Sequence, residues 1–504
     1  MTNPRLHRLT ALLLAAVMAA SVLVSCSGGS TTTEKETGAV NEGTETVLDT
    51  TPAVTDRSQA KDSLPEKKYN GKEFHSLIRS EWLYEFVSEE QTGETINDAI
   101  YDRNKNVEDR FDVKLKFIDM KGGWNDRNTF NAAIEGEVKS GSGAYDMIAG
   151  YQAYIITPAM NGYLHNIYSM PHLEMSQPWW SEKCNQSITV NDRLFLTTGD
   201  ISLTFWNNIF CFLFNKQVAK DSQIGDIYGM VRDGKWTLDA LTEISSKVSR
   251  DLNGDGVYDK NDFFGFITYT NNHSRAWMVA CETPLTRLNA QKEMEACFNN
   301  AHTLEVLDKL FKLYYQNSSY IKGTELNEPN ASTLPQIFVE DRALFSAGYL
   351  GNTETLREMD SDFGIIPMPK YDEAQQEYHT TVHNSVSMIC FPITTPDKDF
   401  SGMIAEGMCS ESYRTVVEGF YDVCLKSRNS RDEESAEMID MIRDSVMFDF
   451  GWVHSVPMSS IGTIFETLLN ANNTNFASYW ASKESEVLKG IDTINNAYLK
   501  IELD

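Results

Sequence analysis

The residues best placed to do chemistry form an acidic loop that runs from Asp251 to Asp262. Oxygen-bearing side chains stand at loop positions one, three, five, nine and twelve, and Gly256 stands where the chain must turn sharply. Ca²⁺ prefers many oxygen ligands in a flexible cage, and this spacing is that of an EF-hand loop. The sequence therefore predicts a Ca²⁺ site, the alternative being a turn without metal. The predicted ligands are Asp251, Asn253, Asp255, the Val257 carbonyl, Asp259 and Asp262.

The residues after this loop indicate what the ion would do. Phe263–Ile267 is an apolar run that predicts a strand, whereas a sensing EF-hand would continue into a helix. No pair of helices is present to open when the ion binds, so we expect a structural role for Ca²⁺.

Sequence signatures of catalysis are missing. The chain has no His-Glu-x-x-His zinc motif, no phosphate-binding Walker loop and no Gly-x-Ser-x-Gly elbow. Its nine His residues are scattered. Asp and Glu are so numerous that a glycosidase pair of carboxylates can be neither selected nor excluded. These observations favour a binding protein over an enzyme.

The N-terminus predicts export and lipid anchoring. Arg5 and Arg8 give a basic start, and the apolar run Leu9–Val24 follows. This run is too short for a membrane-spanning stop-transfer helix. Leu23-Val24-Ser25-Cys26 is typical of a lipobox, in which the Cys receives diacylglycerol and cleavage leaves it as the new N-terminus, the position that carries palmitate in lipoproteins. We expect a signal peptide over 1–25 and Cys26 anchored on the extracellular face of the cell membrane; the alternative is an ordinary signal peptide.

A polar tether is predicted between this anchor and the folded body. Residues 26–66 are rich in Ser, Thr, Gly, Glu and Asp and lack aromatic residues, so they cannot bury enough apolar surface to fold. About 440 residues remain, more than one hydrophobic core usually holds, so we expect two lobes. The net charge of −28 argues against nucleic acid and anionic lipid as partners. The seven cysteines after Cys26 match no metal motif.

Strand and helix patterns alternate along the body. Phe74–Ile78, Val113–Phe117 and Tyr145–Ala149 predict strands, with amphipathic helical patterns between them. This order is typical of a parallel sheet covered by helices on both faces. The continuous apolar run Ile209–Phe214 predicts a central strand, and Val386–Phe391 predicts another strand.

Several segments, in order, resemble extracellular solute-binding proteins of family 1, the maltose-binding-protein-like lipoproteins of Gram-positive ABC sugar importers. The similarity extends from about Lys72 to the C-terminal region, with Asp341 standing where the family usually has Gly. Besides the lipobox, the segments are Asn97-Asp98-Ala99-Ile100, Pro178-Trp179-Trp180, Phe214-Asn215-Lys216, Gly234–Asp239, Arg342-Ala343-Leu344-Phe345, Gly364–Pro369 and Arg431–Ser435.

The resemblance implies an α/β, two-lobed periplasmic-binding-protein-like (Venus flytrap) fold with a mixed, mostly parallel sheet in each lobe. Lobe 1 would comprise 67–207 plus 370–420, and lobe 2 would comprise 208–369 plus 421–504. It also implies a monomer that captures a carbohydrate, an oligosaccharide in particular, between the lobes and delivers it to the transmembrane subunits of an ABC permease. A surface glycoside-acting enzyme and a ligand-presenting sensor subunit are the alternatives.

A sugar site needs aromatic rings for the flat sugar faces and polar side chains for the hydroxyl rim. Such residues close to predicted strands are candidates, because ligands of α/β proteins bind at the carboxyl ends of strands. Some follow a predicted strand, whereas Trp206, Asn207 and Asn384 precede one and Trp277 lies in a predicted polar loop. Each ring has a place in the core as its alternative, whereas Trp179 and Trp180 are assigned to packing. The candidates are Trp82, Tyr84, Tyr151, Trp206, Asn207, Trp277, Tyr349, Asn384 and Trp452.

Overall fold

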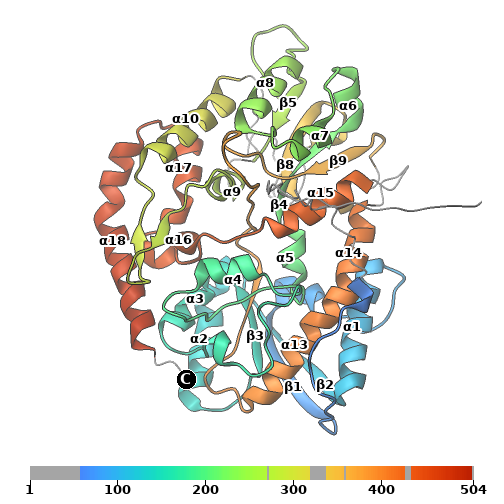
Figure 1. Ribbon diagram of the computed structural model, residues 1–504, viewed down its shortest axis with the longest axis vertical. Helices are drawn as coiled ribbons and strands as arrows, with labels where there is room; N and C mark the ends of the chain where they lie inside the picture. Colours follow the sequence, from blue (N-terminus) through green and yellow to red (C-terminus); the bar gives the residue numbers. More distant parts are fainter. Residues whose placement is uncertain (1–56, 270–271, 318–335, 357–358, 426–432, 502–504) are drawn as a thin grey trace, which may run out of the picture. The chain divides into compact units, whose positions relative to one another are not determined.

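The computed structural model describes most of the body and leaves the predicted anchor aside (Figure 1). The predicted signal peptide, Cys26 and most of the tether lie outside the described residues. None of the helices that are described is long and apolar enough to cross a membrane. The described residues are 57–269, 272–317, 336–356, 359–425 and 433–501.

The first sheet has the order β10-β3-β1-β2. β1 pairs in parallel with both β2 and β3, whereas β10 is antiparallel to β3. α1 connects β1 to β2 and buries Ile100, Val107 and Phe111, the face that its helical spacing predicts. α2 connects β2 to β3, which completes the expected β-α-β-α-β order. The bounds are β1 Lys72–Arg79, α1 Thr95–Phe111, β2 Val113–Met120, α2 Arg127–Ser140, β3 Met147–Tyr151 and β10 Ser387–Cys390.

The second sheet has the order β5-β8-β4-β9, with all four strands buried. This burial explains the continuous apolar runs in these segments. β4 is antiparallel to β8 and β9, and β5 is parallel to β8. Each sheet thus has three strands running one way and one strand running the other. The bounds are β4 Phe210–Asn215, β5 Phe264–Ile267, β8 Ala343–Tyr349 and β9 Phe363–Ile366.

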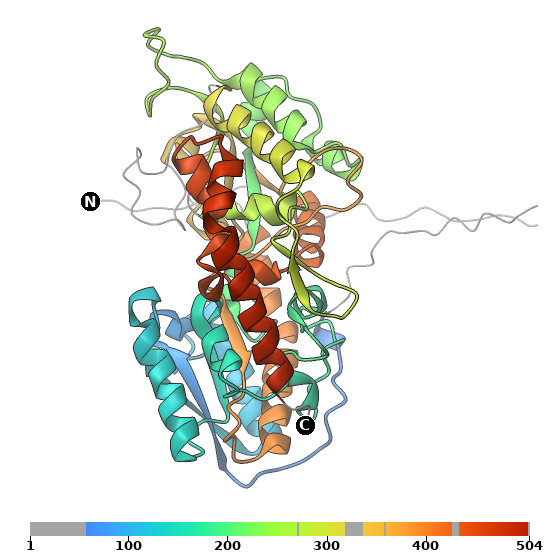
Figure 2. The same cartoon turned by 90° about the vertical axis from the view of Figure 1, so that its left-hand side faces the viewer.

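Helices surround both sheets, and α5 lies between the two sheets in Figure 1. The C-terminal helix α18 packs against both α3 and β7, and its length is visible in Figure 2. The remaining elements are α3 Gln152–Met160, α4 Glu182–Ile188, α5 Leu203–Asn207, α6 Lys216–Asp221, α7 Ile227–Arg232, α8 Leu238–Val248, α9 Asn272–Ala280, β6 Thr286–Leu288, β7 Met294–Ala296, α10 Ala301–Tyr315, α11 Gln336–Val339, α12 Asn352–Thr355, α13 Lys398–Arg414, α14 Val416–Leu425, α15 Glu433–Asp444, α16 Phe450–Val453, α17 Ile464–Asn470 and α18 Phe476–Lys500.

The strands of the first sheet fall within the ranges predicted for lobe 1, and those of the second within the ranges predicted for lobe 2. The lobe boundaries themselves stay a prediction. The chain crosses between the sheets through α5 and through a segment that includes Val382, which forms an isolated bridge with Ile209.

The end of the predicted tether differs from the expectation. The Asp62 carboxylate accepts hydrogen bonds from both terminal nitrogens of Arg110 at 2.7 Å, and Leu64 is buried. Arg57 donates to Asp440 at 2.7 Å and lies over the Tyr421 ring. Residues 57–66 therefore belong to the body, because paired charges and one apolar anchor offset the cost of ordering this polar segment.

Candidate functional site

A cavity of about 270 Å³ lies beyond the carboxyl end of β3, and we call it the aromatic cavity. Tyr151 ends β3 and contributes one ring, Trp124 follows β2 and contributes a second, and Trp452 of α16 contributes a third. Its lining also includes Gln152, Ala153, Arg275, Asn384, Ser455, Val456, Ser460 and Thr463. Flat rings surrounded by amide, hydroxyl and guanidinium groups can bind a ligand that has both apolar faces and polar edges.

Three of the predicted ligand residues meet at this cavity. Tyr151 is half-buried and donates a long hydrogen bond, 3.4 Å, from its hydroxyl to the Asn384 side-chain oxygen. Trp452 is 5 % exposed, and its indole N–H is buried without a hydrogen-bond partner among the residues that the structure describes. Buried donors are rarely left unpaired in proteins, so a ligand oxygen beside Trp452 would complete its bonding. The role of all three residues in ligand binding stays a prediction.

Arg275 and Trp124 are lining residues that the sequence reasoning missed. Arg275 lies on α9, where its Nε donates to Glu466 of α17 at 2.6 Å. Trp124 is 45 % exposed and lies under the guanidinium of Arg127, 4.5 Å from its ring centroid. Its position shortly after β2 was a usable signal, because that strand end lies at the same edge of the sheet as Tyr151.

Arg79 supports the Tyr151 ring of the aromatic cavity. It is the last residue of β1 and is 1 % exposed, and its guanidinium lies 5.1 Å from the Tyr151 ring centroid and 5.6 Å from that of Trp82. It donates to the Ser385 carbonyl at 2.7 Å and to the Ser387 hydroxyl at 2.6 Å. Both bonds come from the same terminal nitrogen, Nη2, and the cation held in this way contacts the Tyr151 ring through a cation–π interaction.

The charges of Arg79 and Arg275 affect the pKa values of groups around this cavity. Burial raises the pKa of Tyr151, and Arg79 and Arg275 oppose that rise. Burial raises the pKa of Tyr349 as well, with Arg275 again opposing. Burial and the charge of Arg275 lower the pKa of His383 to about 3. His383 is therefore neutral at physiological pH, and the tyrosines keep their protons.

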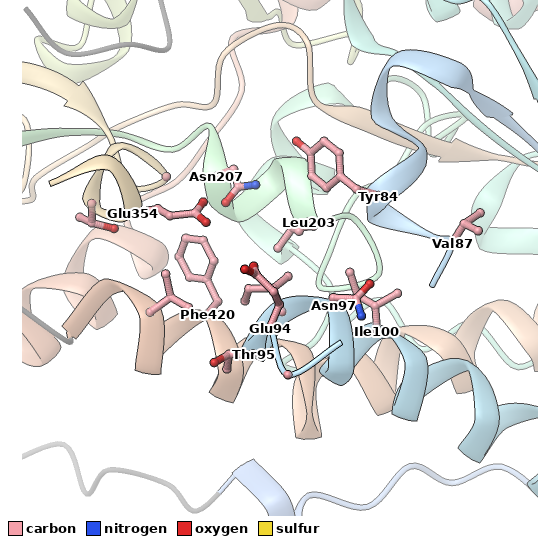
Figure 3. A pocket seen from close by; sticks show the side chains of 15 residues that line it. Tyr84, Val87, Glu94, Thr95, Asn97, Ile100, Leu203, Asn207, Glu354 and Phe420 are labelled. Atoms are coloured by element: carbon pink, nitrogen blue, oxygen red, sulfur yellow. The ribbon is translucent and has the colours of Figure 1, made fainter. Parts of the chain in front are cut away.

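A second cavity, of about 430 Å³, holds two further predicted residues, Tyr84 and Asn207 (Figure 3). Its floor is apolar, with Leu203 and Phe420 among the lining side chains. Figure 3 shows the carboxylate of Glu354 and the Asn207 amide facing the same space. Glu94, at the start of α1, adds another carboxylate to the lining. This cavity has fewer rings and more negative charge than the aromatic cavity.

Trp82 lines neither of the two cavities and is half-buried. Its ring contacts Tyr84 edge-on, with centroids 6.0 Å apart, and faces the Arg79 guanidinium. Trp82 therefore packs against Tyr84 and Arg79 in this structure and supports them from outside the cavities.

The prediction that Trp206, Trp277 and Tyr349 bind the ligand is wrong, because each is a core residue. Trp206 is fully buried on α5 and donates to Asp200 at 2.9 Å. Trp277 is fully buried and donates to the Tyr314 hydroxyl at 2.7 Å. It lies on α9 rather than in the predicted loop. Successive helical residues point about 100° apart, so Arg275 reaches the cavity while Trp277 packs inward.

Tyr349 ends β8 as expected, but its ring packs against Phe210 and His273 and is 3 % exposed. Its hydroxyl has no hydrogen-bond partner in the described ranges. The assignment of Trp179 and Trp180 to packing is confirmed, since both rings are buried. Their indole N–H groups donate to the two carboxylate oxygens of Glu406 at 2.8 and 2.7 Å.

The acidic loop uses its carboxylates to hold its own backbone. Asp251 accepts hydrogen bonds from the amides of Gly254 and Gly256, which contributes to lowering the pKa of its carboxyl. Asp262 is fully buried and accepts from the amides of Leu252 and Asp259. Among the residues that the structure describes, no group of three or more His, Cys, Asp or Glu is arranged to hold a metal ion. The Ca²⁺ site stays a prediction.

The chain is similar to known proteins at the level of structure. A scan against protein-family models and a search of the curated proteins found no match. An extracellular solute-binding protein from Staphylococcus aureus, solved in complex with maltose, has a TM-score of 0.54 at 11% identity, covering 85% of this chain and 98% of its own. An ABC substrate-binding protein from Listeria monocytogenes, in complex with cycloalternan, has a TM-score of 0.51 at 12% identity over 85% and 99%.

An extracellular solute-binding protein of family 1 from Alicyclobacillus acidocaldarius has a TM-score of 0.51 at 10% identity, with 85% of this chain and 100% of that chain covered. At such identities the likeness concerns the fold. The helices and the two mixed sheets described above agree with it. The chain therefore has the two-lobed α/β fold of the extracellular solute-binding proteins of ABC importers.

Proposed function

We propose that this protein is an extracellular solute-binding lipoprotein that captures a carbohydrate, an oligosaccharide in particular, and delivers it to an ABC permease. The observation that carries the proposal is the aromatic cavity, where Trp124, Tyr151 and Trp452 surround one space beside Arg275 and Asn384. Rings stack on the apolar faces of a sugar, and the polar groups bond its hydroxyl rim. The solved structures with maltose and cycloalternan support the same ligand class.

The position of the cavity suits capture by closure. Its lining combines Tyr151, at the end of a strand of the first sheet, with Arg275 of α9 and Trp452 of α16. Both helices lie in the ranges predicted for lobe 2. A ligand that contacts both sides favours the closed arrangement, since it binds that arrangement better than the open one. A permease could then distinguish the loaded protein by its shape.

Anchoring at the membrane is part of the proposal. The lipobox at Leu23-Val24-Ser25-Cys26 would place the lipid at the N-terminus, and the polar segment after it would separate the body from the membrane surface. The protein would act as a monomer on the extracellular face of the cell.

The alternative of a glycoside-acting enzyme is weaker at this cavity. Glycoside hydrolysis in most families uses two carboxylates on either side of the scissile bond. Asp and Glu are absent among the described residues that line the aromatic cavity. A ligand-presenting sensor subunit would use the same cavity and differ only in its membrane partner.

The proposal is tested by measuring sugar binding to the purified full chain. A panel of neutral and acidic oligosaccharides is screened by thermal shift, because a ligand specific to the folded state raises the melting temperature. Tyr151→Ala should weaken the binding free energy of a positive ligand by about 1–3 kcal/mol, as loss of a central ring does. Tyr168→Ala is the matched control, since this tyrosine is 48 % exposed and lines neither of the two cavities.

Two results would count against the proposal. If none of the saccharides shifts the melting temperature, the protein is not a sugar-binding protein of this kind. If chromatography shows that a bound oligosaccharide is shortened during incubation, the protein is an enzyme. Recovery of the intact sugar, with weaker binding in Tyr151→Ala and unchanged binding in Tyr168→Ala, supports capture without chemistry.

A further inference from the structure

The aromatic cavity differs in charge from the rest of the molecule. The chain has 72 acidic and 44 basic residues, and its net charge is −28. The cavity of about 430 Å³ includes Glu94 and Glu354 in its lining. By contrast, Arg275 is the one charged side chain among the described residues that line the aromatic cavity. An arginine without a lining carboxylate, in so acidic a protein, favours a ligand that carries negative charge.

The ion pair of Arg275 leaves part of its guanidinium available. Its Nε and Nη2 both lie near the same carboxylate oxygen of Glu466, at 2.6 and 2.5 Å. The guanidinium has five N–H donors in a planar fork, so its Nη1 edge remains for a second acceptor. Arg275 is a lining residue of the cavity, and its side chain is 15 % exposed.

A second guanidinium lies close to the Tyr151 ring. Arg79 is 5.1 Å from the Tyr151 ring centroid. Arg79 and Arg275 both oppose the rise in the pKa of Tyr151 that burial causes.

The other polar groups at this wall add donors. The Trp452 indole can only donate, and its buried N–H has no partner within the described part of the chain. Asn384 uses its side-chain oxygen to accept from Tyr151, so its NH2 group remains for a ligand. A neutral sugar hydroxyl needs an acceptor as well as a donor when it is buried, whereas an anionic group only accepts.

We propose that the ligand of the aromatic cavity is an acidic saccharide, whose carboxylate or sulfate group binds between Arg275 and the indole N–H of Trp452. The inference rests on the proposed function and specifies its substrate class. Trp124 and Tyr151 would stack on the sugar rings, and the amide of Asn384 would bond the rim.

The test compares ligands of the same shape with and without charge. Isothermal titration of the full chain uses uronate disaccharides, their methyl esters, a sulfated disaccharide and maltose. At least one acidic disaccharide should bind, with affinity about ten- to a hundredfold above that of its uncharged counterpart, as charged hydrogen bonds do. Its affinity should fall as salt rises. A uronate that binds while the sulfated sugar does not identifies a carboxylate ligand, and the reverse result identifies a sulfate ester.

Variants locate the effect. Arg275→Gln should weaken acid binding about tenfold or more and remove the preference over the ester, while Arg275→Lys should keep part of that preference. Trp452→Phe keeps the ring but loses the donor and should weaken the acid more than the ester. Arg287→Gln is the matched control, because Arg287 is an exposed arginine paired with Glu295 outside both cavities.

The outcomes separate this inference from the proposed function. If maltose binds and none of the acidic sugars does, or if acid and ester bind equally, the inference is overturned while sugar capture stands. If no saccharide of either class binds, the proposed function fails and the inference fails with it. Since the acid–ester comparison uses the unmodified chain, it decides the matter even if Arg275→Gln does not fold.

Discussion

Trp277→Ala should strongly destabilise the protein, although the residue stands two positions from a lining residue of the site. Its indole is fully buried, packs edge-on against Phe212 with centroids 5.8 Å apart, and donates to the Tyr314 hydroxyl. Truncation removes this burial, loses the hydrogen bond and leaves a void that the second sheet cannot close fully. Buried Trp→Ala changes cost about 3–5 kcal/mol, so a loss near 4 kcal/mol is expected.

Trp124→Ala is the matched substitution. Trp124 is 45 % exposed, and its ring contacts the Arg127 guanidinium at the surface. Its removal should change the free energy of unfolding by less than about 1 kcal/mol, because surface changes are usually small. The same change should weaken sugar binding by about 1–3 kcal/mol, since the ring lines the aromatic cavity.

Urea unfolding followed by tryptophan fluorescence and circular dichroism measures both variants against the parent. The free energy of unfolding should fall only in Trp277→Ala, and titration should show weak binding only in Trp124→Ala at temperatures where both variants are folded. If Trp277→Ala unfolds at the parent's midpoint, the placement of this ring in the core is wrong. If Trp124→Ala binds sugar as the parent does, the aromatic cavity is not the site.

Three further outcomes are expected. Burial raises the pKa of Glu406 from 4.5 to about 7, so the folded state binds this proton more tightly and stability falls as pH rises through that window. Denaturant titrations from pH 4.5 to 7.5 should show the parent losing about 3 kcal/mol more unfolding free energy than Glu406→Gln. Parallel pH profiles of the two unfolding free energies would refute the effect. Cys26→Ala should release the folded protein into the medium, and its retention in salt-washed membranes would exclude the lipid anchor. A chelator should lower the melting temperature of the parent but not that of Asp251→Ala/Asp255→Ala. An unchanged melting temperature of the parent would show that the loop holds no Ca²⁺.

The strands could be predicted from the sequence because their signal is local. The expected strand at Phe74–Ile78 is β1, and the apolar run Ile209–Phe214 is β4 with its start shifted by one residue. A strand that is buried on both faces must be apolar throughout, so its composition identifies it without knowledge of its neighbours. The resemblance to solute-binding proteins drew on the order of such segments, and the structure agrees with that fold.

Site residues could be predicted only in part. Tyr151 and Trp452 line the aromatic cavity, whereas Trp206 and Trp277, which were candidates for the same aromatic character, lie in the core. Arg79 gave no signal at all, because its role depends on Ser385 and Ser387, about 300 residues further along the chain.

The sequence by itself determined the order of strands and helices, the acidic charge and the set of rings from which a sugar site could be built. Tertiary structure alone decided which rings face the cavity. Arg275 and Trp277 illustrate the reason, since both lie on α9 and the packing of that helix turns one toward the ligand side and the other toward Phe212. Exposure depends on what packs against a residue from distant parts of the chain, and residue type and local spacing do not contain that information.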